Sequence, residues 1–451
     1  MSANRETAAV TPLSIVEPAV ATPSPAATQP PWPLATRIAF RFACAFWLLF
    51  LFPWPVSDWI PPLGRLWGVW MDKLMPWIGH HLLRIQRDLP IEQTGSGDRT
   101  VDWINYGVYL ALAIVAAVVW SIADRRRTRY DRLHEVVRIL VRYCLALTMF
   151  GYGIIKLFKG QFHALAPFRY IETYGETSPM GLLWTFMGHS PAYVIFAGAG
   201  ETLGAALLCF RRTTTLGALV VVAVMTNVVM LNLCYDVPVK LGSSTYLLMA
   251  LFLLAPDARR LANLFVLNRP TQPAAQELVL PRRWMRIGRV VAKVAILGFA
   301  LFSTIKMARQ NGKFSFEPKT FMDGIWDIKG LVKNGAVVPL PLTDDKSWRR
   351  VVFVLDGMNV RTMSNERVVT YNKSEDEAKH QLTLTPLDEK LKPKKGPSYV
   401  LVETRVDHDH VTLAGKLAGD DVELQLQRVD PAKSLLRTRG FHWITEEPFN
   451  R

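Results

Sequence analysis

The sequence predicts a multi-domain α and β protein, in which a polytopic α-helical membrane bundle of about seven spans precedes a small antiparallel β-barrel. Three observations predict this fold class. Half of the 451 residues are hydrophobic, and they come in uninterrupted runs rather than at amphipathic spacing. The basic residues cluster in short loops beside these runs. From about Glu317 the pattern changes to short alternating segments separated by turn residues.

The N-terminal quarter of the chain combines a tail, two spans and a surface helix. Residues 1–33 are rich in Ala, Thr and Pro without periodicity, which predicts a disordered cytoplasmic tail. Residues 34–122 contain two spans, 34–52 and 103–122, joined by a long extracytoplasmic segment. Within it, RLWGVWMDKLMPWIGHHLLRIQRD spaces its aromatic and aliphatic residues like an interfacial helix. We therefore expect this segment to lie on the membrane.

The arginine-rich loops predict how the chain crosses the membrane. DRRRTRYDRLHEVVR follows the second span, and arginines in short loops stay on the cytoplasmic side. Further spans are expected at 139–158, 193–210, 214–234, about 239–254 and 287–305. This alternation places Arg211, Arg212 and the basic loop 259–289 on the same side as the first arginine cluster. The N-terminus is thus expected inside and the C-terminal domain outside the cytoplasm, in a bacterial inner membrane.

Charge and cysteine content exclude several classes of function. The net charge of +15 follows from the loops beside the spans, so no nucleic-acid partner is expected. The four cysteines form no CxxC pair, which argues against a disulfide framework. His408-Asp409-His410 fits a hairpin turn better than a metal site, and no zinc signature occurs, so no metal is predicted.

Residues 317–451 predict an extracytoplasmic β domain. About eight strands in roughly 130 residues are enough for a closed barrel, which removes exposed strand edges. Gly324-Ile325-Trp326 opens the first strand and resembles the G-x-W signature of lipocalins. The resemblance implies that Trp326 closes the barrel floor and that an arginine from the last strand covers it. Arg428 and Arg437 are the two candidates.

Four spans within residues 139–254 carry the segments YGIIKLFKGQF, SPMGLLWTFMGHSPAY, FAGAGETLGAALLCFRRTTTLGAL and TNVVMLNLCYDVPVK. Together they resemble the DoxX-like family of four-helix membrane proteins. The resemblance implies a Gly and a Lys near the outer end of the first helix and an acidic residue within the second, here Gly153, Lys156 and Glu201. It also implies quinone-linked redox work, including thiosulfate:quinone oxidoreduction. More distant relatives act as membrane chaperones or cargo receptors.

Glu201 and Lys156 are the candidate catalytic residues. At 1.5 Å rise per residue, Glu201 lies about 12 Å and Asn227 about 10 Å below the outer surface, so they share a level. Lys156 starts nearer the boundary, and its long stem can reach down toward Glu201. A lone carboxylate at this depth costs roughly 2.5–3.5 kcal/mol, so Glu201 must be paired, protonated or hydrated. A structural pair and a role in binding or proton exchange both remain open.

Further polar residues fall in the outer half of the same bundle. The candidate ligand-binding residues are Tyr152, Gln161, Asn227, Asn232, Tyr235, Asp236 and Lys240. Polar groups in hydrocarbon normally face a bundle interior or a ligand, although either asparagine could instead form an interhelical hydrogen bond.

Two functions are consistent with these features. The first is the binding of a lipid-soluble or amphipathic molecule, a quinone in particular, in a complex with a redox partner subunit and with membrane lipids. The alternative is a non-catalytic chaperone, cargo receptor or lipid-handling protein that uses the β domain for docking. Whether the protein is an enzyme stays open, because no redox centre of its own is recognisable in the sequence.

Overall fold

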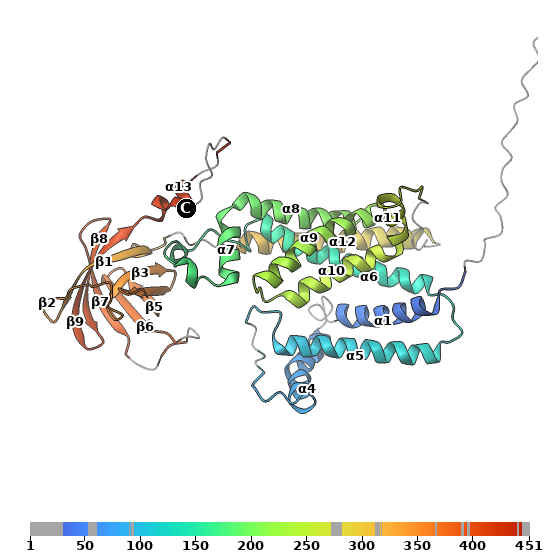
Figure 1. Cartoon of the computed structure of the whole chain (residues 1–451), viewed down its shortest axis with the longest axis horizontal. Helices are drawn as coiled ribbons and strands as arrows, with labels where there is room; N and C mark the ends of the chain where they lie inside the picture. The colour runs from blue at the N-terminus through green and yellow to red at the C-terminus, as the bar shows by residue number, and fades with distance from the viewer. Residues whose placement is uncertain are drawn as a thin grey trace, which may run out of the picture.

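The computed structural model describes residues 30–52, 61–89, 91, 94–271, 282–311, 316, 318–365, 368–388, 392–394, 397–439 and 442–443. Within this part of the chain, seven helices are long and apolar enough to cross a membrane. The C-terminal part is a closed antiparallel barrel of eight strands. The two regions lie end to end (Figure 1). The predicted fold class, a helical membrane bundle followed by a small β-barrel, is confirmed.

The helical region contains one four-helix bundle and additional helices packed around it. Its helices are α1 (Leu34–Leu51), α3 (Pro61–Val69), η1 (Trp70–Leu74), α4 (Met75–His81), α5 (Thr100–Ala123), α6 (Asp131–Leu157), α7 (Pro179–His189), α8 (Pro191–Leu208), α9 (Thr214–Cys234), α10 (Lys240–Leu254), α11 (Ala258–Phe265) and α12 (Arg283–Asn311). In the bundle, α6 contacts α8, α8 contacts α9, α9 contacts α10, and α10 returns to α6. Helix α1 packs on α5 and α6, and α12 packs on α6.

Several helix ends differ from those that hydropathy predicts. Helix α6 begins at Asp131 rather than at residue 139, and α12 spans Arg283–Asn311 rather than 287–305. A helix continues through charged residues as long as its backbone hydrogen bonds are formed, whereas a hydropathy window ends at the first charges. Helix α7 was not predicted. It starts where the Ser178 side chain accepts a hydrogen bond from the Gly181 N–H.

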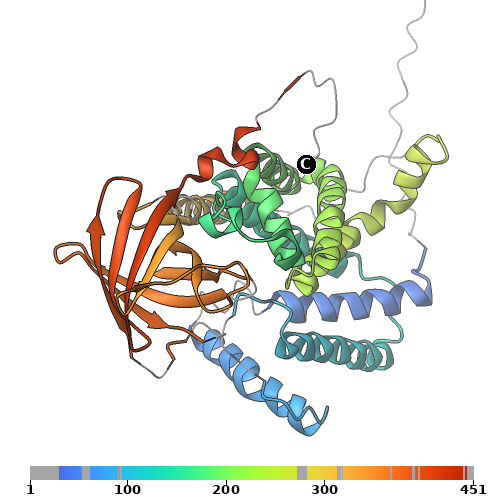
Figure 2. The same ribbon diagram turned by 60° about the vertical axis from the view of Figure 1, so that its left-hand side comes forward.

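The N-terminal segments partly fall outside the described residues. The predicted disordered tail lies outside them as far as residue 29, but Trp32 packs against Phe40 and Tyr130 and so belongs to the folded part. The segment expected on the membrane surface is helical over α3, η1 and α4. This helix branches away from α1 and α5 and runs across the direction of the long helices (Figures 1 and 2).

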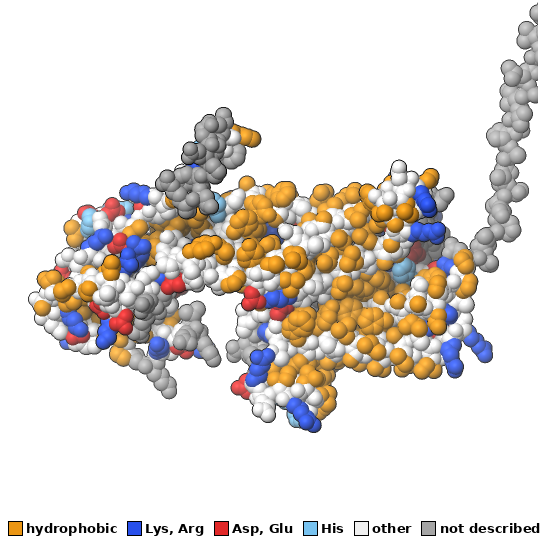
Figure 3. All heavy atoms as spheres, in the orientation of Figure 1, with side chains coloured by type: hydrophobic (Ala, Val, Ile, Leu, Met, Phe, Trp, Pro, Cys, Tyr) orange, Lys and Arg blue, Asp and Glu red, His pale blue; other side chains and the backbone are white. Residues whose placement is uncertain are grey.

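Apolar side chains cover most of the face of the helical region that Figure 3 shows. On α5, for example, Val115, Val119 and Ile122 are more than half exposed. A surface of this extent is unfavourable in water and suits contact with lipid chains. Lys and Arg side chains gather at the end of the bundle that lies away from the barrel (Figure 3).

The barrel is a simple meander. Its strands are β1 (Gly324–Lys333), β2 (Ala336–Val337), β3 (Trp348–Val354), β4 (Gly357–Thr362), β5 (Val368–Asp376), β6 (Gln381–Pro386), β7 (Tyr399–Arg405), β8 (His410–Leu417) and β9 (Asp420–Val429). Strand β1 pairs with β3 on one side and with β9 on the other, which closes the ring. Strand β2 pairs only with the end of β1. Closure leaves no long unpaired edge.

The barrel rests on the helical region through its outer wall. Ile325 and Val352 are cross-strand neighbours that point away from the barrel core, yet each is only 1% exposed. The 3-10 helix η2 (Pro167–Tyr170), in the connection between α6 and α7, contacts β1 and β3 there. Nearby, Arg361 Nη1 donates a hydrogen bond of 2.7 Å to Glu176 Oε2. The barrel therefore lies beside the end of the bundle where α6 ends and α8 begins.

Candidate functional site

A buried ion pair joins two helices of the bundle. Lys156 Nζ on α6 donates a hydrogen bond to Glu201 Oε1 on α8. The two side chains are 8% and 3% exposed. The structure thus brings together the two residues singled out as candidate catalytic groups. Because the two side chains carry opposite charges, the pair is close to neutral overall and can remain in a low-dielectric interior.

Two glycines allow the pair to form. A Cβ on Gly153 would lie 2.8 Å from the Gly198 carbonyl oxygen, and a Cβ on Gly198 would lie 2.7 Å from the Gly153 carbonyl oxygen. Neither position therefore accepts a side chain without moving the helix backbones apart. The close approach of α6 and α8 brings Lys156 within reach of Glu201, and it follows the small-residue packing usual in membranes.

One oxygen of the pair is left without a donor. Glu201 Oε2 is buried and has no hydrogen-bond partner among the residues that the structure describes. Tyr152, one turn before Lys156, places its ring centroid 5.9 Å from Lys156 Nζ and 6.2 Å from the Tyr246 ring. Tyr152 is 41% exposed and so lies at the rim of the pair. The free oxygen can hold a proton or accept a hydrogen bond from a ligand.

The two asparagines of α9 have different surroundings. Asn232 is buried, and its Nδ2 donates a 3.0 Å hydrogen bond to Ser243 Oγ on α10. This is the interhelical bond left open as an alternative. Asn227 is exposed, so the structure does not bring it to Glu201. Asn227 and Asn232 lie five positions apart on α9, so their side chains point about 140° apart at 3.6 residues per turn. Asn232 is buried and Asn227 is exposed.

Asp236 and Lys240 belong to the start of α10 rather than to the ion pair. They form a 2.7 Å salt bridge, and the Asp236 side chain is 82% exposed. The backbone N–H groups of Lys240 and Leu241 donate to the Asp98 carboxylate at 2.7 and 2.9 Å. Sequence reasoning missed Asp98, because it comes from a distant loop and caps a helix more than a hundred residues later.

Tyr235 and Gln161 lie just beyond the C-terminal ends of α9 and α6, respectively. Tyr235 packs against a small apolar cluster that includes Phe162, Leu183 and Val237. Gln161 is partly buried, and its Oε1 has no partner among the described residues. Gln161 is therefore a second unsatisfied acceptor in the helical region, next in sequence to Phe162 of the cluster.

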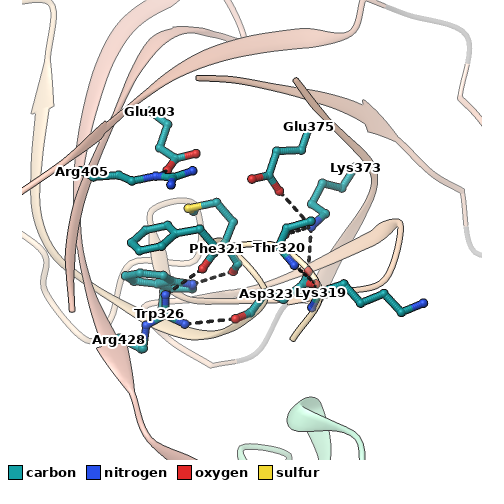
Figure 4. Close-up of polar contacts among 11 residues, drawn as sticks. Lys319, Thr320, Phe321, Asp323, Trp326, Lys373, Glu375, Glu403, Arg405 and Arg428 are labelled. Atoms are coloured by element: carbon teal, nitrogen blue, oxygen red, sulfur yellow. Dashed lines mark hydrogen bonds and ion pairs between the residues drawn. The ribbon is translucent and has the colours of Figure 1, made fainter. Parts of the chain in front are cut away.

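The barrel floor is built around Trp326, which is fully buried (Figure 4). Trp326 Nε1 donates a 2.8 Å hydrogen bond to the Met322 carbonyl oxygen. Arg428, its partner in the β1–β9 register, places its guanidinium 4.1 Å from the Trp326 ring centroid and donates to the carbonyl oxygens of Phe321 and Asp323. Arg437 instead lies 5.7 Å from the Tyr170 ring centroid. Arg428 is thus the arginine that covers the floor.

Comparison with known proteins finds no matching family model and no matching solved structure. The chain is 36% identical over 138 residues to YwoB of Bacillus subtilis, an uncharacterized protein, and the match spans 88% of YwoB and 30% of this chain. The chain belongs to the same family as YwoB. Since no activity is described for YwoB, membership of the YwoB family by itself assigns no reaction and no ligand.

Sequence reasoning also missed a group of charges inside the barrel. On β5, Lys373 and Glu375 lie two and four positions after Tyr371, whose side chain belongs to the barrel core. On β7, Glu403 and Arg405 lie two and four positions after Leu401, which also belongs to the core. Charged residues at alternate strand positions are normally taken as solvent-facing, which hid this group. The signal that could have revealed them is the alternation of side chains along a strand, which places these charges on the same face as apolar residues. No described His, Cys, Asp or Glu residues form a metal-binding group.

Proposed function

We propose that this protein is a multi-pass inner-membrane protein that binds a lipid-soluble or amphipathic molecule, with a quinone as the favoured ligand, beside the Lys156–Glu201 pair. The observation that carries the proposal is a buried ion pair whose Glu201 Oε2 lacks a donor. Ionisable groups at such depth are costly and are found mainly where ligands or protons move. The resemblance to the DoxX-like family adds the quinone.

The chemistry follows from the two side chains. A quinone that accepts two electrons also takes up two protons at its oxygen atoms, so its site needs a donor that can be refilled. Glu201 and Lys156 would hold and pass such a proton, and the Tyr152 hydroxyl at the rim would donate a hydrogen bond. The electrons must come from a redox partner subunit. In this proposal the protein supplies binding and proton exchange.

The distribution of charge supports the proposed orientation. Lys and Arg side chains gather at the end of the bundle opposite the barrel (Figure 3). Such clusters stay cytoplasmic, so the N-terminal side would face the cytoplasm and the barrel the periplasm. The Lys156–Glu201 pair then lies in the periplasmic half, where membrane lipids and a diffusing quinone reach it from the bilayer.

Direct binding to wild type and three variants tests the proposal. The full-length protein in nanodiscs is titrated with a short-chain ubiquinone analogue. The matched control is Asp257→Asn, because Asp257 is also buried and accepts hydrogen bonds from Thr215 Oγ1 at 2.7 Å and Arg260 Nη1 at 2.6 Å. Asp257 follows the C-terminal end of α10, at the end of the bundle that lies away from the barrel. We expect Glu201→Gln and Lys156→Met to weaken binding at least tenfold and Asp257→Asn to leave it unchanged. Equal affinity in all four proteins would refute the site.

A second candidate function is non-catalytic handling of lipid or client proteins, with the barrel as a docking module. The Arg361–Glu176 contact favours it, because it fixes the barrel beside the outer end of the bundle. Mass spectrometry of the gently purified protein separates the two functions. A bound phospholipid that is lost from Trp326→Ala but retained in Glu201→Gln would favour lipid handling over the quinone site.

A further inference from the structure

We propose that the closed end of the barrel binds a primary ammonium head group at Glu375, with Glu403 facing it. By closed end we mean the end that residues 319–323 and Trp326 seal (Figure 4). This site is separate from the Lys156–Glu201 pair. It rests on the buried charges of β5, β7 and the floor, and does not depend on the function proposed above.

The first step is the pairing of these charges. Lys373 Nζ donates to Asp323 Oδ1 at 2.8 Å and to Thr320 Oγ1 at 3.2 Å, and it lies 3.4 Å from Glu375 Oε2. An ammonium has three N–H donors, so these three acceptors use all of them. Lys373 therefore cannot supply a further donor to Glu375.

The second step is the balance of charge. Asp323 has Lys373 as its close partner, and Glu403 accepts a hydrogen bond from Arg405 Nε. Lys373 and Arg405 thus each neutralise one carboxylate. Glu375 keeps only the long 3.4 Å contact to a lysine already shared with Asp323. Arg428, the third cation at the floor, donates instead to the carbonyl oxygens of Phe321 and Asp323. Glu375 is therefore the carboxylate of this group that lacks a close cation of its own.

The third step is the unsatisfied oxygen. The Glu375 side chain is 4% exposed, and its Oε1 has no hydrogen-bond partner among the described residues. In Figure 4 the carboxylates of Glu375 and Glu403 point toward each other across the same part of the interior. The Glu403 side chain is 1% exposed. A buried carboxylate oxygen without a donor is unfavourable, so a donor from outside the chain would stabilise it.

These features select the class of ligand. The missing group must carry positive charge and donate hydrogen bonds, and a primary ammonium does both in a small volume. Next to the charges the barrel interior is apolar, with Leu382, Leu384 and Leu401 all fully buried. An alkyl chain on the ammonium would suit this environment. The ligand class is therefore an amphiphile with a primary amine head.

Calorimetric titration of the full-length protein in nanodiscs with n-hexylammonium tests the site. The matched variants are Glu375→Gln and Glu377→Gln, because Glu377 is the exposed acidic residue just beyond the same strand. Two further probes, n-hexanol and hexyltrimethylammonium, lack the charge and the N–H donors respectively. We expect saturable binding of n-hexylammonium to wild type and Glu377→Gln, at least tenfold weaker binding to Glu375→Gln, and at least tenfold weaker binding of both other probes.

Three results would overturn the site. Equal binding to wild type and Glu375→Gln would place the probe elsewhere. Equal binding of n-hexanol would mean that only the alkyl chain is recognised, and no saturable binding would mean that a proton or water satisfies Glu375. If Glu375→Gln does not fold, the probe series on wild type decides alone. Glu201→Gln must retain n-hexylammonium binding, which separates this test from that of the bundle site.

Discussion

The bundle and the barrel both bury charged side chains, but they satisfy them differently. In the bundle, Glu201 meets one lysine and keeps one oxygen without a donor. In the barrel, Asp323 accepts from Lys373 and also from the backbone N–H groups of Lys319 and Thr320, at 2.9 and 3.0 Å. A turn offers free backbone donors, whereas the N–H groups of a helix interior are already used by the helix.

The same difference explains where the unsatisfied carboxylates occur. Glu201 lies within a helix and Glu375 within a strand, and in both elements the neighbouring backbone donors belong to the regular hydrogen-bond pattern. Each of these residues therefore depends on side chains, and each has one oxygen left over. In both proposed sites, the unsatisfied oxygen therefore belongs to a carboxylate buried on a regular element.

The largest expected effect comes from removing the barrel lysine, and removal of the bundle lysine provides the comparison. Lys373→Met leaves Asp323 and Glu375 buried without a cation, which should cost about 3–5 kcal/mol of unfolding free energy. Lys156→Met should cost only about 1–2 kcal/mol, because the unfolded state in a membrane also finds polar partners. The cost of Lys373→Met is measured by denaturant unfolding, with protease cleavage of the barrel as the readout. The cost of Lys156→Met is measured by unfolding in an SDS titration. Equal costs would contradict the comparison.

A smaller effect is expected from filling the helix contact that holds the bundle pair. Gly153→Ala should cost about 2 kcal/mol, because its Cβ meets the Gly198 carbonyl. Gly151→Ala is the matched control on the same helix, since a Cβ there meets no atom within 4 Å. SDS titration of both variants decides. A loss of stability in Gly151→Ala as large as that in Gly153→Ala would contradict close packing as the cause, because alanine by itself favours a helix more than glycine does.

The smallest effect concerns the acid stability of the barrel floor. Burial tends to raise the pKa of Asp323, but the hydrogen bonds from Lys373 and from the two backbone N–H groups outweigh it, and the pKa lies below its ordinary value. A lowered pKa adds stability above the unfolded-state value of about 3.9, and this stability is lost as the pH falls through the folded-state pKa. At neutral pH, Asp323→Asn should cost about 1.5 kcal/mol.

The measurement for this third prediction is the unfolding free energy of the barrel between pH 7 and pH 2. The difference between wild type and Asp323→Asn should shrink as the pH falls below about 4, because wild type then loses the same charge. A difference that stays constant over this range would mean that the Asp323 charge does not stabilise the floor.

Sequence patterns predicted the architecture well and the sites only in part. Long apolar runs predict spans regardless of packing, because a membrane requires about 20 apolar residues per helix. Strand count and the Gly324-Ile325-Trp326 motif likewise predicted the barrel, with Trp326 buried at its base. Position along a helix was also readable from the sequence, because each residue adds a fixed rise. Rotation about the helix axis was not, and for this reason Asn227 was expected in the interior although it is exposed.

The sequence by itself determined the seven apolar helices, the closed barrel and the presence of Lys156 and Glu201 in neighbouring spans. Only the tertiary structure decided which charges meet. The Gly153–Gly198 contact fixes the pair in the bundle, and strand parity together with the floor turn places Lys373 and Glu375 inside the barrel. The physical reason is that hydrophobicity acts on each residue alone, whereas hydrogen bonds and ion pairs need a partner at a fixed distance and direction.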